Sequence, residues 1–364
     1  MHKTAASPLA LIYAVLIVYA SLYPFADWRD QGMEAWAFLL APLPHYWTKF
    51  DVAINVAGYL PFGGLLALGV LRSGRSRRPW LVAFLCASLL SLGMETLQSY
   101  LPVRVASRED WLLNSLGAAV GAAATLGLER VGAIDRWTHF RRRWFYESSR
   151  GGLVLLATWP LALLFPPAVP FGLGQVFERI ETGVAERLAD TPFLEWMPVR
   201  EVELQPLLPG AEWVCILLGL LIPCLLGFCV VRPGVRRLVF ALLCIGLGSL
   251  ATGLSAMLSW GPEHAWAWLD LPAQVAMVAS LVLAPLLSLV PSRVSAALVL
   301  LGLGVYLSIL NQAPANPYFA QTLQAWEQGQ FIRFNGLAQW LGWVWPYAVL
   351  VYVVTVIWQR DPAA

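Results

Sequence analysis

The sequence predicts an all-α polytopic membrane protein, with about ten transmembrane helices and with both termini in the cytoplasm. Hydrophobic residues make up 59% of the 364 residues, charged residues make up only 13%, and long apolar runs recur along the chain. An ordinary soluble domain carries about 25% charged residues. The formal net charge of +2 gives no indication of a nucleic-acid partner, so none is expected.

Ten apolar runs are candidates for the membrane-spanning helices, each of which needs about 20 mostly apolar residues. They lie at residues 8–26, 52–71, 80–98, 110–129, 151–168, 212–231, 237–259, 272–290, 294–311 and 336–357. The fifth run is short and rich in proline, and only Pro291-Ser292-Arg293 separates the eighth run from the ninth.

The distribution of basic residues predicts the orientation. The termini and the loops that follow even-numbered spans hold 16 of the 24 Lys and Arg residues. Because basic loops stay in the cytoplasm, this side is predicted to be cytoplasmic, and the loops at 27–50, 169–211 and 312–335 face outward. Segments 175–189 and 317–331 place apolar residues at helical spacing, so we expect amphipathic helices on the outer membrane surface.

A basic stretch divides the chain into parts. Residues 1–130 are predicted to form a four-helix membrane domain, 131–150 a basic cytoplasmic connector, and 151–364 a six-helix membrane domain with outer loops. The five cysteines lie in apolar runs without disulfide or zinc spacing, and the four histidines are scattered. We therefore expect no metal site and no cofactor.

Three apolar segments in the first third of the chain each carry a carboxylate and an amide. Residues three or four apart share one face of a helix, so each segment presents one polar stripe. Ionisable residues in apolar spans are costly and usually face a partner or a cavity. The predicted topology brings the three stripes to the outer leaflet. The pairs are Asp51 and Asn55, Glu95 and Gln98, and Asp110 and Asn114.

Glu95 is the strongest functional candidate and the best candidate for a catalytic residue. It lies about six residues before the end of its predicted helix, which places it about 9 Å inside that end. A carboxylate at that depth should be paired, protonated or exposed to a wet cavity. The alternative is a hydrogen bond that only joins two helices.

The loop that follows carries two arginines and a helix start. Ser107 and Asp110 have the spacing of a capping pattern, so Asp110 has an alternative role at the helix N-terminus. Arg104 and Arg108 are expected to lie above the three acids, and one or both of them to pair with Asp51, Glu95 or Asp110. Such a site suits a phosphate held by arginine, a divalent cation held by carboxylates, or a buried ionic lock. Further along, the small residues of Gly117-x3-Gly121 let another helix approach closely.

At these residues the chain resembles the VanZ-like family of bacterial integral membrane proteins, over about residues 8–130. The resemblance rests on Asp51-x3-Asn55, Pro61-Phe62-Gly63, Glu95-x2-Gln98 and Arg104-x2-Ser107-x2-Asp110-x3-Asn114-x2-Gly117-x3-Gly121. The family is named after a protein of a glycopeptide-resistance cluster, linked to low-level teicoplanin resistance. The resemblance implies a cell-envelope role in the bacterial cytoplasmic (inner) membrane, but no agreed reaction.

The leading hypothesis is a polar outer-leaflet pocket that binds the headgroup of an anionic lipid or a lipid-linked glycan. Its partners would be membrane lipids or a lipid-linked envelope precursor. The pocket would use Asp51, Asn55, Glu95, Gln98, Arg104, Ser107, Arg108, Asp110 and Asn114. Three alternatives stay open: a membrane-embedded enzyme with Glu95 as general acid or base, a transporter or flippase, and a scaffold that locks three helices together. The sequence favours a non-enzymatic role, since it has no nucleophile–histidine pair and no recognised metal motif.

Overall fold

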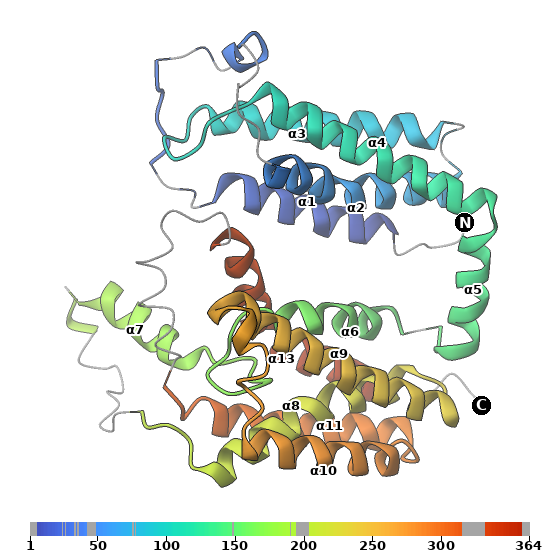
Figure 1. Cartoon of the computed structure of the whole chain (residues 1–364), viewed down its shortest axis with the longest axis vertical. Helices are drawn as coiled ribbons and strands as arrows, with labels where there is room; N and C mark the ends of the chain where they lie inside the picture. The colour runs from blue at the N-terminus through green and yellow to red at the C-terminus, as the bar shows by residue number, and fades with distance from the viewer. Residues whose placement is uncertain are drawn as a thin grey trace. The chain divides into compact units, whose positions relative to one another are not determined.

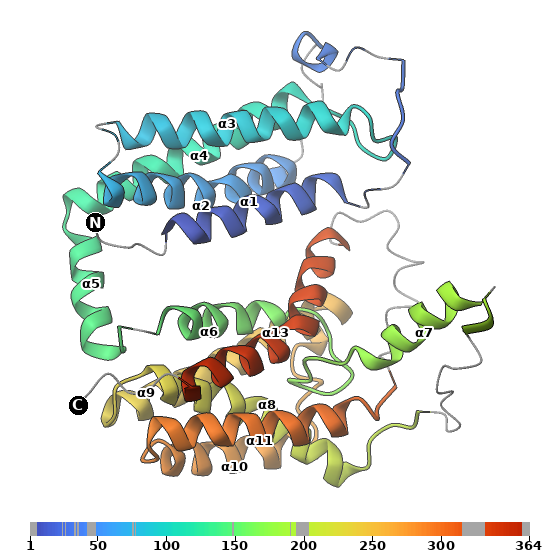
Figure 2. The ribbon, with the colours of Figure 1, turned by 180° about the vertical axis from the view of Figure 1, so that it is seen from behind.

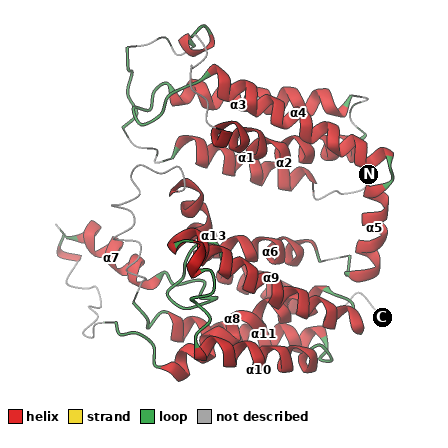
Figure 3. Ribbon diagram, in the orientation of Figure 1, coloured by secondary structure: helices red, strands yellow, loops and turns green. Residues whose placement is uncertain are grey.

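The regular elements of the protein are helices. The computed structural model describes residues 6–23, 25, 27–32, 34, 36–41, 49–74, 76, 78–147, 149–189, 191–193, 204–314 and 332–358. Every regular element in these ranges is a helix, which confirms the all-α prediction (Figure 3).

Six of the described helices are long and apolar enough to cross a membrane, so the chain is a membrane protein. They are Val52–Ser73, Pro79–Gln98, Arg108–Arg130, Pro209–Val230, Val235–Trp260 and Ser292–Leu310, and each coincides with a predicted span. The helices Ala6–Leu22 and Leu271–Leu287 are apolar but shorter. The total of ten spans and the cytoplasmic position of both termini stay predictions.

The chain divides into two compact units, Met1–Phe140 and Arg141–Ala364. Helix α5 (Ala133–Trp144) carries the boundary, within the basic stretch 131–150 (Figure 1). The division into two membrane domains joined by a connector of defined length stays a prediction.

Four long helices form the first unit. They are α1 (Ala6–Leu22), α2 (Lys49–Ser73), α3 (Pro79–Gln98) and α4 (Arg108–Arg130), with the short 3-10 helix η1 (Ala37–Leu39) after α1. Helix α2 packs along α4 over most of its length, and α3 lies beside both of them (Figure 2). This packing brings the three polar stripes of the sequence onto neighbouring helices.

Glycines permit the close approach of α2 and α4. A Cβ atom at Gly121 would lie 1.9 Å from the Leu60 main-chain oxygen, and one at Gly117 would lie 2.3 Å from the Val56 oxygen. Such distances are far shorter than a van der Waals contact, so only glycine fits. The prediction that another helix approaches at these glycines is confirmed, and α2 is that helix.

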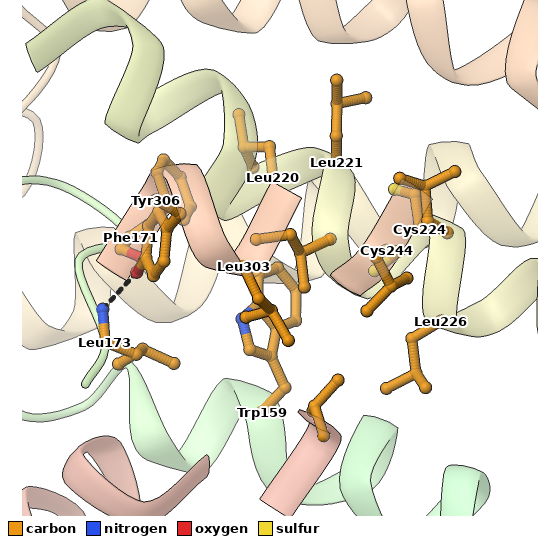
Figure 4. Packing of buried hydrophobic residues seen from close by; sticks show 14 of the residues in the cluster. Trp159, Phe171, Leu173, Leu220, Leu221, Cys224, Leu226, Cys244, Leu303 and Tyr306 are labelled. Carbon is orange, nitrogen blue, oxygen red and sulfur yellow. Dashed lines mark hydrogen bonds between the residues drawn. The ribbon is translucent and has the colours of Figure 1, made fainter. Parts of the chain in front are cut away.

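The second unit is built around one buried helix. Its helices are α6 (Arg150–Ala162), α7 (Phe177–Leu188), α8 (Pro209–Val230), α9 (Val235–Trp260), the 3-10 helix η3 (Pro262–His264), α10 (Leu271–Leu287), α11 (Ser292–Leu310) and α13 (Ile332–Trp358). Helix α8 is buried along most of its length, with α6, α9, α10 and α11 packed around it. Figure 4 shows part of this core, including Leu220 and Leu226 of α8 with Trp159 of α6 and Leu303 of α11.

The fifth predicted span is wrong as a single helix over 151–168. Helix α6 ends at Ala162 after 13 residues, so it is about 20 Å long at 1.5 Å per residue, shorter than the hydrocarbon core of about 30 Å. Proline lacks the main-chain N–H that a helix needs, and Pro166 and Pro167 follow within the next five residues. Residues 163–176 are irregular and lead into α7, which confirms the amphipathic helix predicted within 175–189. The helix predicted at 317–331 lies outside the described residues.

Candidate functional site

The polar stripes of the first unit meet where α2 begins, α3 ends and α4 begins. The structure describes the side chains of eight of the nine predicted site residues. The side chain of Asp51 lies outside the described part, although its main chain belongs to the first turn of α2, four residues before Asn55.

Glu95 lies within this cluster and is 3% exposed. The main-chain N–H of Ser107 donates a hydrogen bond of 2.8 Å to Glu95 Oε2, because the loop after α3 folds back over the end of that helix. Asp110 lies near enough to interact electrostatically with Glu95. Among the described residues, the Glu95 carboxylate makes no second hydrogen bond and no ion pair.

Ser107 caps α4, as its spacing predicts. Its Oγ accepts hydrogen bonds from the main-chain N–H groups of Glu109, at 3.1 Å, and Asp110, at 3.4 Å. In a capping box the acid three residues after the cap would accept the Ser107 N–H, but Glu95 of α3 accepts it instead. Asp110 Oδ1 accepts from Asn55 Nδ2 at 2.7 Å, so this acid joins α4 to α2. Its place in the first turn also suits the helix dipole.

A second row of polar contacts joins α3 to α4 deeper in the unit. Asn114 Nδ2 donates to Ser91 Oγ at 3.0 Å, while Ser88 Oγ accepts from both Ser115 Oγ, at 2.9 Å, and Trp111 Nε1, at 3.1 Å. Trp111 and Ser115 were not among the predicted site residues. Their spacing of four residues places them on one face of α4, but only the packing reveals that this face meets Ser88.

Two buried polar atoms near Ser91 lack hydrogen-bond partners among the described residues. These are Asn114 Oδ1 and the Tyr59 hydroxyl. The Tyr59 hydroxyl lies close to Ser91 and within electrostatic range of Glu95. Buried polar groups are normally satisfied by protein or ordered water. The cluster therefore has capacity for further hydrogen bonds.

The two arginines contact main-chain oxygens. Arg104 Nη2 donates to the oxygens of Ala20, at 3.2 Å, and Tyr23, at 2.6 Å, and Gln98 Nε2 donates to Ser21 at 2.9 Å. Gln98 and Arg104 therefore satisfy carbonyl groups at the C-terminal end of α1.

Arg108 contacts η1, where its Nη1 donates to the Leu39 oxygen at 3.4 Å. Its Nε is buried without a hydrogen-bond partner among the described residues. Within the described part of the chain, Arg108 forms no ion pair with Glu95 or Asp110. The ion pair found there joins Arg72 to Asp135. Any pairing with Asp51 lies outside the described residues.

The described carboxylates do not form a metal site. In the part of the chain that the structure covers, no three His, Cys, Asp or Glu side chains gather as a metal ion would need. Glu95 and Asp110 are neighbours without a third described ligand.

A comparison with protein families matches this unit. Residues 9–128 match the family described as VanZ/LLP1, and these residues include all nine predicted site residues. No match was found among curated proteins or among solved structures. Over residues 9–128 this membrane protein is therefore VanZ-like, and the resemblance predicted from its motifs is confirmed.

Proposed function

We propose that the VanZ-like unit binds the headgroup of an anionic lipid or a lipid-linked glycan, in the outer leaflet of the bacterial cytoplasmic membrane. One observation carries this proposal. Glu95 is almost fully buried with a single described hydrogen bond, and near it Asn114 Oδ1 and the Tyr59 hydroxyl make no hydrogen bond of good geometry with a described residue. A cluster with this much unused hydrogen-bonding capacity is suited to a polar ligand and its waters.

The available groups divide into two types. Glu95 and Asn114 Oδ1 are acceptors, which suit the hydroxyl or amine groups of a headgroup. Arg108 is the better candidate for a phosphate contact, because its one described hydrogen bond is long, at 3.4 Å, whereas Arg104 Nη2 already donates to two carbonyl oxygens at the end of α1.

A scaffold role is the second candidate, and a specific observation favours it. The bond from Ser107 to Glu95 joins a loop to α3, and the bond from Asn55 to Asp110 joins α2 to α4. Each of these contacts stabilises the arrangement of the helices with no ligand present. The two candidates differ in what they predict when the Glu95 carboxyl is replaced by an amide.

The test measures ligand binding and stability on the same variants. Purified full-length protein would be titrated with phosphatidylglycerol and with a polyprenyl-pyrophosphate-linked disaccharide, with bound ligand counted by native mass spectrometry. We expect Glu95→Gln and Arg108→Gln each to weaken binding of at least one ligand about tenfold, the effect of losing one strong hydrogen bond. The ligand-free melting temperature should be unchanged.

Glu129→Gln supplies the matched control, because Glu129 lies in the last turn of the same helix that begins at Arg108. It should bind both ligands like the wild type. If Glu95→Gln lowers the melting temperature and leaves both affinities intact, the cluster is a scaffold and the binding proposal is wrong.

A further inference from the structure

The second unit contains a small cavity, open to solvent, that has no part in the proposed function. It lies between the irregular segment after α6, the first turn of α7, and α13. Its wall combines apolar and polar side chains, among them Pro166, Leu173, Gln175, Arg179, Gln339 and Trp343.

The irregular wall of this cavity is held by side chains from α11 and α13. The Tyr306 hydroxyl accepts from the Leu173 main-chain N–H and donates to the Phe171 oxygen, the latter at 2.7 Å (Figure 4). Asn311 Oδ1 accepts from the N–H of Val176 at 3.1 Å, and the Tyr347 hydroxyl donates to Gly174 at 3.1 Å. Within the hydrocarbon core of a membrane, non-helical chain persists only where it is buried in protein or lines a polar cavity. These bonds make the wall a fixed surface.

The same segment holds strained main chain. Phe171 has a φ of 61°, a left-handed conformation that a bulky residue rarely adopts, and Gly174 has a φ of 92°. The positive φ of Gly174 favours glycine, and a Cβ atom there would also lie 2.9 Å from the Pro346 ring. Strain of this kind persists where the surroundings impose it, and it gathers at binding sites.

Arg179 supplies a cation at the cavity. Its guanidinium lies over the Trp343 ring, 4.6 Å from the ring centroid, and makes no hydrogen bond or ion pair with a described residue. Burial lowers the pKa of Arg179 and nearby Glu178 opposes that effect, but an arginine stays charged in either case. Stacking on the ring leaves the N–H groups at the edge of the guanidinium available.

We propose that this cavity is a second binding site, which holds a phosphate group through Arg179 and places the apolar part of its ligand against Trp343 and Pro166. The planar guanidinium donates two parallel hydrogen bonds to phosphate oxygens, and stacking fixes its orientation in advance. The apolar wall favours an amphiphilic phosphate ester. This site is independent of the Glu95 cluster, since every residue that forms it belongs to the second unit.

The test separates a lipid from a free phosphate. Full-length protein would be titrated with phosphatidylglycerol, read by native mass spectrometry, and with inorganic phosphate, read by the melting temperature in phosphatidylcholine nanodiscs. We expect Arg179→Gln to weaken phosphatidylglycerol binding about tenfold. Loss of the phosphate response in the same variant would support recognition of the phosphate group itself. A response limited to phosphatidylglycerol would support a lipid as the source.

Arg187→Gln is the matched control, because Arg187 lies on the same helix but does not line the cavity. It should bind both probes like the wild type. Arg179→Lys, which keeps the charge without the planar fork, should recover part of the affinity and shows that the site is folded. Equal binding of phosphatidylglycerol by wild type, Arg179→Gln and Arg187→Gln would overturn the proposal.

Discussion

Arg237 has a structural role that its charge alone does not predict. The sequence places it among the basic residues that predict the cytoplasmic side, yet it is only 2% exposed. Its guanidinium donates to the main-chain oxygens of Val231, at 3.1 Å, Ser288, at 3.3 Å, and Val290, at 2.6 Å. It therefore ties the turn between α8 and α9 to the end of α10, where helix carbonyls lack partners.

We expect Arg237→Ala to destabilise the protein by about 2–4 kcal/mol, because three main-chain carbonyl groups, two of them in buried hydrogen bonds, lose a charged donor. The melting temperature of purified protein in detergent measures this loss. The neighbouring exposed Arg236 supplies the control, since Arg236→Ala removes the same charge from the same turn. Equal melting temperatures for the two variants would contradict a structural role for Arg237.

At the scale of residues, helical spacing and hydrophobic context predict that Glu95, Asp110 and Asn114 share one polar region, and the structure places them in one cluster. Their role in binding stays a prediction, and their partners were not predictable. The partner of Glu95 is the main-chain N–H of Ser107, which depends on how the loop after α3 closes. Arg104 was expected above the acids, but two of its hydrogen bonds satisfy the end of α1, more than 80 residues away in sequence. Such long-range main-chain contacts leave no local pattern.

Among the elements, the contact between α2 and α4 depends most strongly on residue size. We expect Gly121→Ala to destabilise the protein by about 1–3 kcal/mol or more, because the new methyl group would overlap the Leu60 main-chain oxygen and force the helices apart. Gly127→Ala on the same helix meets no atom within 4 Å, so it should be neutral or stabilise α4 by up to about 1 kcal/mol. Thermal unfolding of both variants gives the comparison, and similar destabilisation by both would refute the packing argument.

Helix positions were predictable where apolar runs were long. Helices α2, α3, α4, α8, α9 and α11 each coincide with a predicted span. The failure at α6 has a physical cause: hydrophobicity alone cannot distinguish a helix from buried irregular chain. Residues 163–176 are apolar because protein surrounds them, while Tyr306 and Asn311 supply the hydrogen bonds that a helix would have made internally.

At the scale of the whole molecule, the side of the membrane on which the C-terminus lies would show whether the short helix α6 and the irregular segment after it cross the membrane. Both termini are predicted to be cytoplasmic from the bias of Lys and Arg. Burial of Arg237 reduces that bias only slightly, since the other basic residues of the predicted cytoplasmic side are unaffected. Between the loop at Glu147 and the C-terminus lie five long or apolar helices, α8 to α11 and α13, together with α6 and its irregular segment.

If α6 and residues 163–176 together cross the membrane, the number of crossings after Glu147 is six, and the C-terminus lies on the same side as Glu147. If that segment enters and returns, the number is five and the C-terminus lies opposite. We expect the first outcome.

A cysteine introduced at Glu147 or Ser76 should react with a membrane-impermeant maleimide only in permeabilised cells, and one at Asp30 or Glu263 should react in intact cells. A C-terminal green fluorescent protein should fluoresce. A labelled Asp30 position with a dark C-terminal fusion would instead mean that α6 and its irregular segment return to the side from which they entered.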